Sequence, residues 1–140
     1  MLQVSRSFTS DLAELGAMRD FVSDVCGRAW GCTEDDEHLG RLLLALTEAA
    51  ANVIRHAYQG EAGRPILLVV EAGPDQAGLT LSHEGRDFDP KAVPPPSFDG
   101  SREGGFGLFL IAQLVDEVTY FRDDGGRRGV RLVKRRPSPR

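Results

Sequence analysis

The sequence predicts an α/β protein, a two-layer sandwich with helices on one face of a mixed, mostly antiparallel sheet. Three observations predict this fold class. Apolar residues recur with the period of a helix in two long segments near the N-terminus. Short apolar runs of strand length follow in two pairs, and glycine-containing turns join the members of each pair. This order of elements is typical of helices stacked on one face of a sheet.

The bulk properties fit one domain of ordinary size. We expect the 140 residues to form a single nucleotide-binding domain over residues 1–136, followed by a basic tail, 137–140. The composition, 41% hydrophobic and 27% charged, is typical of a soluble globular protein. A net charge of −4 argues against nucleic acid as a partner. No apolar run reaches the roughly 18 residues that a membrane span needs.

The N-terminal sequence and the two cysteines predict a cytoplasmic protein. The N-terminus lacks the basic region, apolar segment and cleavage site of a secretion signal. Cys26 falls on an apolar helical stripe, and no neighbouring residues complete a metal-ligand set around it or Cys32, so we expect reduced thiols. We expect the basic residues near the C-terminus to form a solvated end: Lys134, Arg135, Arg136 and Arg140.

The first predicted elements are an edge strand and a helix. Leu2 to Phe8 alternates apolar and polar residues, as a strand does. Thr9 or Ser10 is expected to cap a helix that ends between Gly27 and Gly31. The predicted apolar face of this helix consists of Leu12, Leu15, Met18, Val22, Val25, Cys26 and Ala29.

A second, longer helix is predicted from about Thr33 to about Tyr58. Thr33, with an aspartate at position 36, resembles a capping box. Glu48 and Asn52 lie one turn apart, nearly opposite the apolar stripe and among small alanines. Two interpretations stay open: a solvated face rich in good helix formers, or room left for a ligand. The apolar stripe consists of Leu39, Leu42, Leu43, Leu46, Ala50, Val53 and Ala57.

The middle of the chain predicts a pair of strands after a loop over residues 59–65. The run Ile66 to Glu71 is apolar and of strand length, and Leu79 to Ser82 forms a second strand. We expect the turn between them to include Gly73, Pro74 and Gly78.

The last third predicts a lid, a helix and a hairpin. Residues 91–105 are rich in proline and glycine, and such a long segment in a small domain is more often a functional lid than a plain connector. A helix over 106–115 follows. Strands over 118–122 and 130–134 then form a hairpin around residues 123–126.

The polar pair and the glycine turn predict a nucleotide site. Glu48 can accept a proton from an attacking hydroxyl, and Asn52 can offer its carbonyl oxygen to Mg²⁺. Gly104, Gly105 and Gly107 let the backbone approach an anion, and the helix that follows adds a partial positive charge at its N-terminus.

Two cations of the lid can meet phosphate charge, Lys91 and Arg102. Arg102 is the better candidate because it lies close to the glycines and its planar guanidinium suits a phosphate. His56, near the end of the second helix, is interpreted as structural.

These motifs resemble the GHKL nucleotide-binding family, and within it the small anti-sigma factor serine kinases of bacterial partner-switching systems. Residues 48–58, with Glu48, Asn52 and His56, resemble the N box of that family. Residues 85–90 resemble its G1 box and residues 105–108 its G2 box. The resemblance covers nearly the whole chain, in the right order and spacing.

The resemblance implies a site and a set of partners. It implies ATP and Mg²⁺ as cofactors, transfer of phosphate to a serine of a small antagonist protein of the STAS fold, binding of a sigma factor in the alternative state, and a possible homodimer. It implies Glu48 as general base and Asn52 as Mg²⁺ ligand. The remaining residues that it implies in ATP binding are His83, Gly85, Arg102, Gly104, Gly105, Gly107 and Leu108.

His83 departs from the family pattern. The G1 box normally carries an aspartate at this position, and its carboxylate accepts a hydrogen bond from the adenine amino group. A neutral imidazole can accept one hydrogen bond, but a protonated one cannot. If His83 is the acceptor, ATP affinity should fall as the pH drops through the pKa of His83.

Two alternative functions stay open. A binding-only regulator of the same fold, with weak or no nucleotide chemistry, is motivated by His83. The catalytic domain of a histidine kinase is disfavoured because 140 residues leave no room for the dimerisation helix pair that normally carries the phosphoacceptor histidine.

Overall fold

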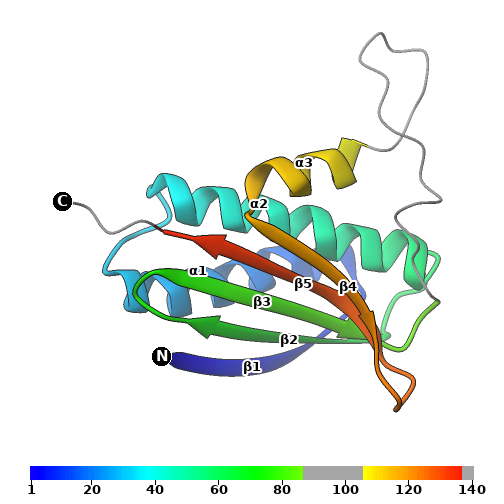
Figure 1. Ribbon diagram of the computed structural model, residues 1–140. Helices are drawn as coiled ribbons and strands as arrows, with labels where there is room; N and C mark the ends of the chain where they lie inside the picture. Colours follow the sequence, from blue (N-terminus) through cyan, green and yellow to red (C-terminus); the bar gives the residue numbers. More distant parts are fainter. Residues whose placement is uncertain (87–105, 137–140) are drawn as a thin grey trace, which may run out of the picture.

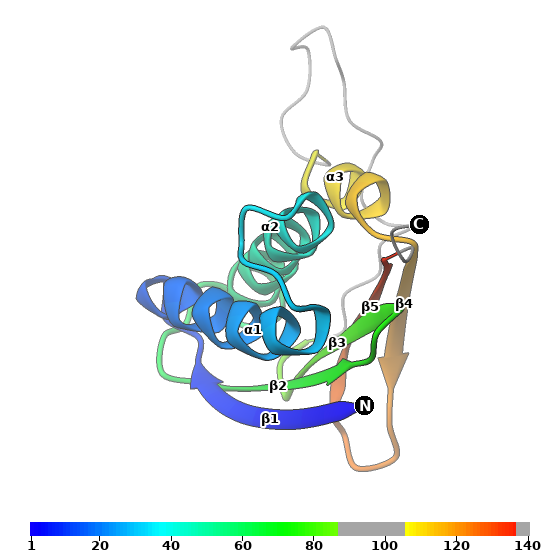
Figure 2. The same ribbon diagram turned by 90° about the vertical axis from the view of Figure 1, so that its left-hand side faces the viewer.

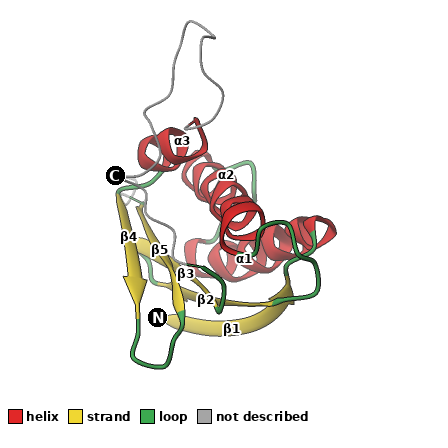
Figure 3. Ribbon diagram, turned by 90° about the vertical axis from the view of Figure 1, so that its right-hand side faces the viewer, coloured by secondary structure: helices red, strands yellow, loops and turns green. Residues whose placement is uncertain are grey.

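The computed structural model describes residues 1–86 and 106–136, which form helices packed on one face of a sheet (Figure 1). The predictions for residues 87–105 and 137–140, including the lid and the C-terminal tail, lie outside the described residues. The predicted α/β fold class is confirmed, and Figure 3 shows the helices on one side of the sheet with the other side uncovered by any described helix.

The elements follow the predicted order. The α helices are α1 (Leu15–Trp30), α2 (Glu37–Asn52) and α3 (Phe106–Leu114), with a short 3-10 turn η1 (Leu12–Glu14) and a π turn η2 (Val53–Ala57). The strands are β1 (Leu2–Thr9), β2 (Pro65–Ala72), β3 (Gln76–His83), β4 (Glu117–Arg122) and β5 (Arg128–Arg135).

The described strands form one five-stranded sheet in the order β1-β2-β3-β5-β4. Every pairing among them is antiparallel, so the sheet of the described residues lacks the parallel part of the expected mixed sheet. Because β5 inserts between β3 and β4, the last strands of the chain lie beside its middle. β1 is an edge strand, as predicted.

The core lies between the helices and the sheet. Figure 2 shows α1 and α2 side by side above the strands, with α3 beside α2. The predicted apolar stripe of α2 and η2 is confirmed, because every one of its residues is buried. Alternate residues of β2 and β3 face this stripe and are fully buried, and burial of each such large aliphatic side chain contributes about 1.5–3 kcal/mol: Ile66, Leu68, Val70, Leu79 and Leu81.

The start of α1 differs from the prediction. Neither Thr9 nor Ser10 caps it, because η1 intervenes and α1 begins only at Leu15. The Ser10 hydroxyl instead donates to the carbonyl of Glu61 (2.6 Å) and accepts from the N–H of Arg64 (2.9 Å). The Ser10 hydroxyl therefore joins the end of β1 to the loop before β2 instead of capping a helix. Leu12, expected on the buried face, is 56% exposed because it belongs to η1.

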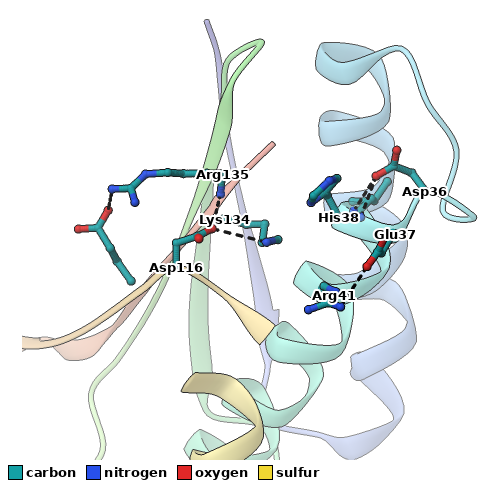
Figure 4. A network of polar contacts seen from close by, with 9 residues as sticks. Asp36, Glu37, His38, Arg41, Asp116, Lys134 and Arg135 are labelled. Atoms are coloured by element: carbon teal, nitrogen blue, oxygen red, sulfur yellow. Dashed lines mark hydrogen bonds and ion pairs between the residues drawn. The ribbon is translucent and has the colours of Figure 1, made fainter. Parts of the chain in front are cut away.

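The cap of α2 is Asp36, and the capping box predicted at Thr33 is wrong. The Asp36 carboxylate accepts from the backbone N–H groups of His38 (2.9 Å) and Leu39 (3.1 Å) (Figure 4). Asp36 therefore lies outside the helix at the position where a side-chain oxygen satisfies the first N–H groups. Thr33 contributes only its backbone carbonyl, which accepts from the Asp36 N–H.

Two expectations about strand ends are also wrong. Gly78 belongs to β3 rather than to the turn before it, which closes through the Gly73 N–H and the Gln76 carbonyl (2.9 Å). Lys134 and Arg135 are residues of β5 rather than a solvated end. Asp116 accepts from the Arg135 N–H (2.7 Å) and lies 3.5 Å from Lys134 Nζ (Figure 4).

Both cysteines are free thiols, as expected. Cys26 packs in the core, where burial raises its pKa to about 12. Among the described residues, no helix has the length and apolar content to cross a bilayer.

Candidate functional site

The polar pair of α2 lies next to a change in helical geometry. Asn52 ends the α-helical part, and in η2 the Tyr58 N–H donates to the Val53 carbonyl (3.0 Å), the wider spacing of a π turn. Such turns occur frequently at functional sites. The Ala57 carbonyl at the end of η2 accepts from the Arg86 N–H (2.9 Å), which ties the segment after β3 to this turn.

The first turn of α3 lies directly on Glu48 and Asn52. A Cβ placed at Gly107 would lie 3.1 Å from Glu48 Oε2 and 3.6 Å from Asn52 Oδ1. The contact with Glu48 is tighter than an ordinary one, so a side chain at this position would require the Glu48 carboxylate to shift, whereas the distance to Asn52 is an ordinary van der Waals contact. The structure thus brings together three residues that the sequence motifs predicted separately.

The alanines around this pair are not a solvated face. Ala45, Ala49 and Ala51 are all buried, and α3 packs beside α2. The interpretation of this side of α2 as solvent-facing is therefore wrong for the alanines, while Glu48 and Asn52 themselves stay half-buried. Ala49 also lines a pocket with Asn52, which agrees with the alternative that small residues leave room.

That pocket lies between the helical layer and the end of the sheet. Its polar lining among the described residues is Asn52, His83, Tyr120 and Arg128. Its other lining residues are Ala49, Val53, Ala57, Phe121, Gly129 and Val130. α2 and η2 thus form one side, and the end of β3 with the β4–β5 hairpin forms the other.

His83 is the last residue of β3 and is only 3% exposed. Its ring meets that of Tyr58 edge-on, with 5.7 Å between centroids. Burial, and then the nearby charge of Arg128, lower the pKa of His83 to about 4, so the ring is neutral at neutral pH.

The hydrogen bonding of His83 differs from the expectation. Its Nδ1 accepts from the Gly85 N–H (3.1 Å). A neutral imidazole has one acceptor nitrogen, so the acceptor that we expected to meet adenine is engaged by the backbone instead. The proton of the ring then resides on Nε2, which is a donor.

Gly85 packs against the backbone of η2. A Cβ placed there would lie 2.5 Å from the Ala57 carbonyl oxygen, so the contact requires glycine. Arg128 Nη1 donates to the Gly85 carbonyl (2.5 Å). Gly85 lines a neighbouring, more open pocket with Arg64, Glu84 and others, rather than the pocket that Asn52 and His83 share.

Of the other residues predicted for the site, one is described by the structure and three are not. Leu108 is half-buried in α3, directly after Gly107. Arg102, Gly104 and Gly105 lie outside the described residues. His56 is exposed at the end of η2.

Sequence reasoning missed the contribution of β5. Arg128 lies directly opposite His83 in the β3–β5 ladder, and Gly129 lies opposite Ser82. Arg128 and Gly129 follow a predicted turn, and this pair could have indicated a contribution to the site. The sequence did not indicate, however, which strand β5 would pair with. Only the strand order places Arg128 at the pocket.

The donor chemistry fits a magnesium ion held mainly by phosphate. The described residues contain no cluster of three or more His, Cys, Asp or Glu side chains that could hold a metal. Mg²⁺ prefers oxygen ligands and is commonly bound by one or two protein groups together with substrate phosphates and water. The amide oxygen of Asn52, at the rim of the pocket and beside α3, is such a group.

The comparison with known proteins gives consistent matches. The model of the histidine kinase-like ATPase domain matches residues 8–134. A serine-protein kinase RsbW of Staphylococcus epidermidis is 36% identical over 114 residues, which cover 74% of this chain and 69% of that protein. A serine-protein kinase RsbW of Staphylococcus aureus is 34% identical over 113 residues, with the same two coverages.

Proposed function

Because the chain belongs to the histidine kinase-like ATPase domain family, we propose that it is a Mg²⁺- and ATP-dependent protein serine/threonine kinase that acts as an anti-sigma regulatory factor. The family predicted from the sequence motifs is thereby confirmed, and the kinase activity is the proposal. Its similarity to serine-protein kinases over most of both chains supports that activity.

The observation that carries the proposal is the approach of α3 to α2. Gly107 is the second residue of α3, whose first turn lies against Glu48 and Asn52, with no room for a Cβ at ordinary contact distance from the carboxylate. A helix N-terminus attracts phosphate through its free N–H groups and its dipole. A general base and an amide oxygen beside such a terminus are suited to phosphoryl transfer, which depends mainly on positioning and electrostatic stabilisation.

Each residue then has a distinct role. Glu48 accepts the proton of the attacking serine hydroxyl, and its half-buried carboxylate lies against Gly107. Asn52 would hold Mg²⁺, which neutralises phosphate charge when bound. Arg102, Gly104 and Gly105 would surround the phosphates, Leu108 would pack beside them, and His83 with Gly85 would border the base.

The proposed phosphate acceptor is a serine of a STAS-type antagonist protein, and the alternative partner is a sigma factor. The sequence resemblance supports both partners. A homodimer and a cytoplasmic location are part of the same proposal.

Calorimetric titration tests the nucleotide site. We expect ATP to bind in the presence of Mg²⁺, to bind more weakly without it, and to bind at least tenfold more weakly to Asn52→Ala. Gln113→Ala, which removes an amide side chain from the exposed side of α3, is the matched control. This variant should bind ATP with the affinity of the wild type. Binding that is indifferent both to Mg²⁺ and to Asn52 would contradict the proposed ligand role.

A binding-only regulator is the second candidate, and one observation favours it. The acceptor nitrogen of His83 is used by the Gly85 N–H, so the pocket lacks the acceptor that adenine would need at this residue. Incubation with a STAS-domain protein and labelled ATP separates the candidates. Label on a serine supports the kinase, whereas a stable complex without nucleotide binding or label supports the binding-only regulator.

A further inference from the structure

The turn η2 is followed by a tyrosine whose hydroxyl joins the ends of two strands. Tyr58 is buried, with 4% of its surface exposed. Its hydroxyl donates to the carbonyl of Pro65 at the start of β2 and accepts from the N–H of Glu84 just after β3 (2.9 Å). A hydroxyl can donate and accept at the same time, so this one side chain satisfies two backbone groups.

The two backbone groups lie where the β2–β3 ladder would continue. The ladder pairs Ile66 with His83, and in the same register Pro65 would lie opposite Glu84. The Tyr58 hydroxyl bridges these two residues instead. The strands therefore part at this point, and the chain after β3 turns towards η2.

The backbone of residues 84–86 is held by side chains and by η2. Besides the contact with Tyr58, its hydrogen bonds run from the Gly85 N–H to His83 Nδ1 (3.1 Å), from Arg128 Nη1 to the Gly85 carbonyl (2.5 Å), and from the Arg86 N–H to the Ala57 carbonyl (2.9 Å). Three elements distant in the sequence, η2, β3 and β5, thus fix one short turn.

This turn lies tightly against η2 and the Tyr58 ring. A Cβ placed at Gly85 would lie 2.5 Å from the Ala57 carbonyl oxygen and 3.0 Å from Cδ1 of Tyr58. The Tyr58 ring also meets the His83 ring edge-on, with 5.7 Å between centroids. Tyr58 therefore contacts the turn through both its ring and its hydroxyl.

We propose that Tyr58 is a positioning residue of the nucleotide site, which holds the turn over residues 84–86, and with it His83 and Gly85, in the geometry that nucleotide binding requires. The proposal rests on the proposed nucleotide site and adds a residue that acts through others. The pocket that Asn52 and His83 share is not lined by Tyr58. Loss of the hydroxyl leaves two backbone groups without this partner, and the turn can then shift away from η2.

The substitution Tyr58→Phe keeps the ring and removes the hydroxyl. We expect ADP with Mg²⁺ to bind about tenfold more weakly in calorimetry, because the turn is no longer held. The KM for ATP should rise by a similar factor, while kcat stays within about twofold, since Glu48 lies on α2 rather than on this turn. Unchanged ADP affinity, or a fall in kcat with an unchanged KM, would overturn the proposal.

Trp30→Phe is the matched control. Trp30 is also buried, and its Nε1–H donates to the Gly73 carbonyl (2.8 Å) in the turn at the other end of β2 and β3. The change removes one side-chain hydrogen bond to a turn of the same strand pair, outside the site. It should lower the free energy of unfolding and leave ADP affinity unchanged. An equal loss of ADP affinity in this variant would show that general destabilisation is the cause, and would contradict the role of Tyr58.

Amide hydrogen exchange tests the contact in the protein without nucleotide. The Glu84 N–H is the group that the Tyr58 hydroxyl accepts from, so its exchange should be at least about tenfold faster in Tyr58→Phe. Amides at the centre of β3 should stay within about threefold of the wild type. A Glu84 amide that exchanges at the wild-type rate would overturn the proposal.

A double-variant cycle tests whether Tyr58 acts through the turn. Gly85→Ala displaces the same turn from η2 by a different route, because its methyl group would meet the Ala57 carbonyl. If both changes act on one turn, the loss of ADP affinity in the double variant should be smaller than the product of the two single losses. A fully multiplicative loss would mean that Tyr58 acts separately from the turn.

The outcomes separate this proposal from the one on which it rests. If the wild type binds ADP and Tyr58→Phe binds it equally well, the nucleotide site stands and the positioning role is wrong. If the wild type binds neither ADP nor ATP at millimolar concentration, both proposals are wrong.

Discussion

At the scale of single residues, the environment of His83 changes the chemistry expected of an imidazole. We expected ATP affinity to fall as the pH dropped through the pKa of this residue. Burial and Arg128 lower that pKa to about 4, so the ring does not titrate between pH 6 and 8. Any pH dependence of nucleotide binding in that range should therefore come from other groups.

The lowered pKa of His83 also predicts how stability depends on pH. The unfolded chain binds a proton at His83 near pH 6.5, whereas the folded protein does so only near pH 4. The contribution is fully present above pH 6.5. Between these values the unfolded state binds more protons, so the free energy of unfolding falls with decreasing pH, by up to about 1.4 kcal/mol per pH unit.

Urea unfolding at pH 7, 6 and 5 measures this effect. The difference in unfolding free energy between wild type and His83→Gln should shrink as the pH falls, because glutamine does not titrate. A parallel profile for His83→Gln would mean that His83 does not titrate as described.

Glu48 gives a prediction about catalysis. Glu48→Gln keeps the size of the side chain beside Gly107 but removes its basicity. Phosphoryl transfer to the protein substrate should fall by about 10²- to 10⁴-fold, the usual range for loss of a general base, while nucleotide affinity stays within a few-fold. Rates come from labelled phosphate on the substrate.

The matched control for this change is Glu37→Gln in the first turn of the same helix. Glu37 is exposed and pairs with Arg41 (3.0 Å) on the same helix, so its loss should leave the rate unchanged. A Glu48→Gln variant that transfers phosphate at the wild-type rate would remove Glu48 from the base role.

At the scale of elements, the close approach of β5 to β3 depends on a glycine. A Cβ placed at Gly129 would lie 2.0 Å from the Leu81 carbonyl oxygen and 2.7 Å from Phe121. Gly129→Ala should therefore lower the free energy of unfolding by about 2–3 kcal/mol, because the strands must separate to accommodate the methyl group. Chemical denaturation measures the loss.

Gly16→Ala is the control for this substitution. Gly16 lies in the first turn of α1, and nothing lies within 4 Å of a Cβ placed there. Alanine is the better helix former, so stability should stay the same or rise by up to about 1 kcal/mol. Equal effects of the two changes would show that crowding at Gly129 is relieved elsewhere.

The elements also show where sequence patterns are sufficient. The periodicity of α2 predicted its buried stripe, because burial against a sheet requires apolar residues at helical spacing. The helix starts were less predictable. Ser10, Thr33 and Asp36 are all acceptable caps by residue type. Asp36 is the one used, because α2 begins directly after it, while the Ser10 hydroxyl is engaged by the loop before β2.

At the scale of the whole molecule, an ion pair joins the end of the sheet layer to the start of a helix in the helical layer. Arg136, just after β5, lies 3.0 Å from Asp36 at the start of α2, and its guanidinium also lies over the Trp30 ring. Arg136 is first among the groups that lower the pKa of Asp36. The pair thus joins two residues that lie 100 positions apart in the sequence.

Loss of Asp36 should destabilise the protein. Asp36→Ala removes both the cap of α2 and the partner of Arg136, and we expect a loss of about 1–2 kcal/mol at pH 7. Since the pKa of Asp36 is lowered by folding, this contribution is present above about pH 4 and is lost as the pH falls through the folded-state value.

The exposed neighbour Asp35, changed to alanine, should cost less than 0.5 kcal/mol in the same thermal and urea measurements. A difference between Asp36→Ala and wild type that persists unchanged at pH 3 would contradict this account.

The sequence by itself determined the fold class, the order of the elements, the buried stripe of α2 and the family, because these depend on local periodicity and on short motifs. It also identified Glu48, Asn52 and Gly107 as candidates for one site. Tertiary structure decided the rest. Strand order placed Arg128 opposite His83, and the turn after β3 engaged the acceptor nitrogen of His83 that was expected to meet adenine. Long-range pairing and burial set the protonation of a side chain, and neither is encoded in the spacing of residues along the chain.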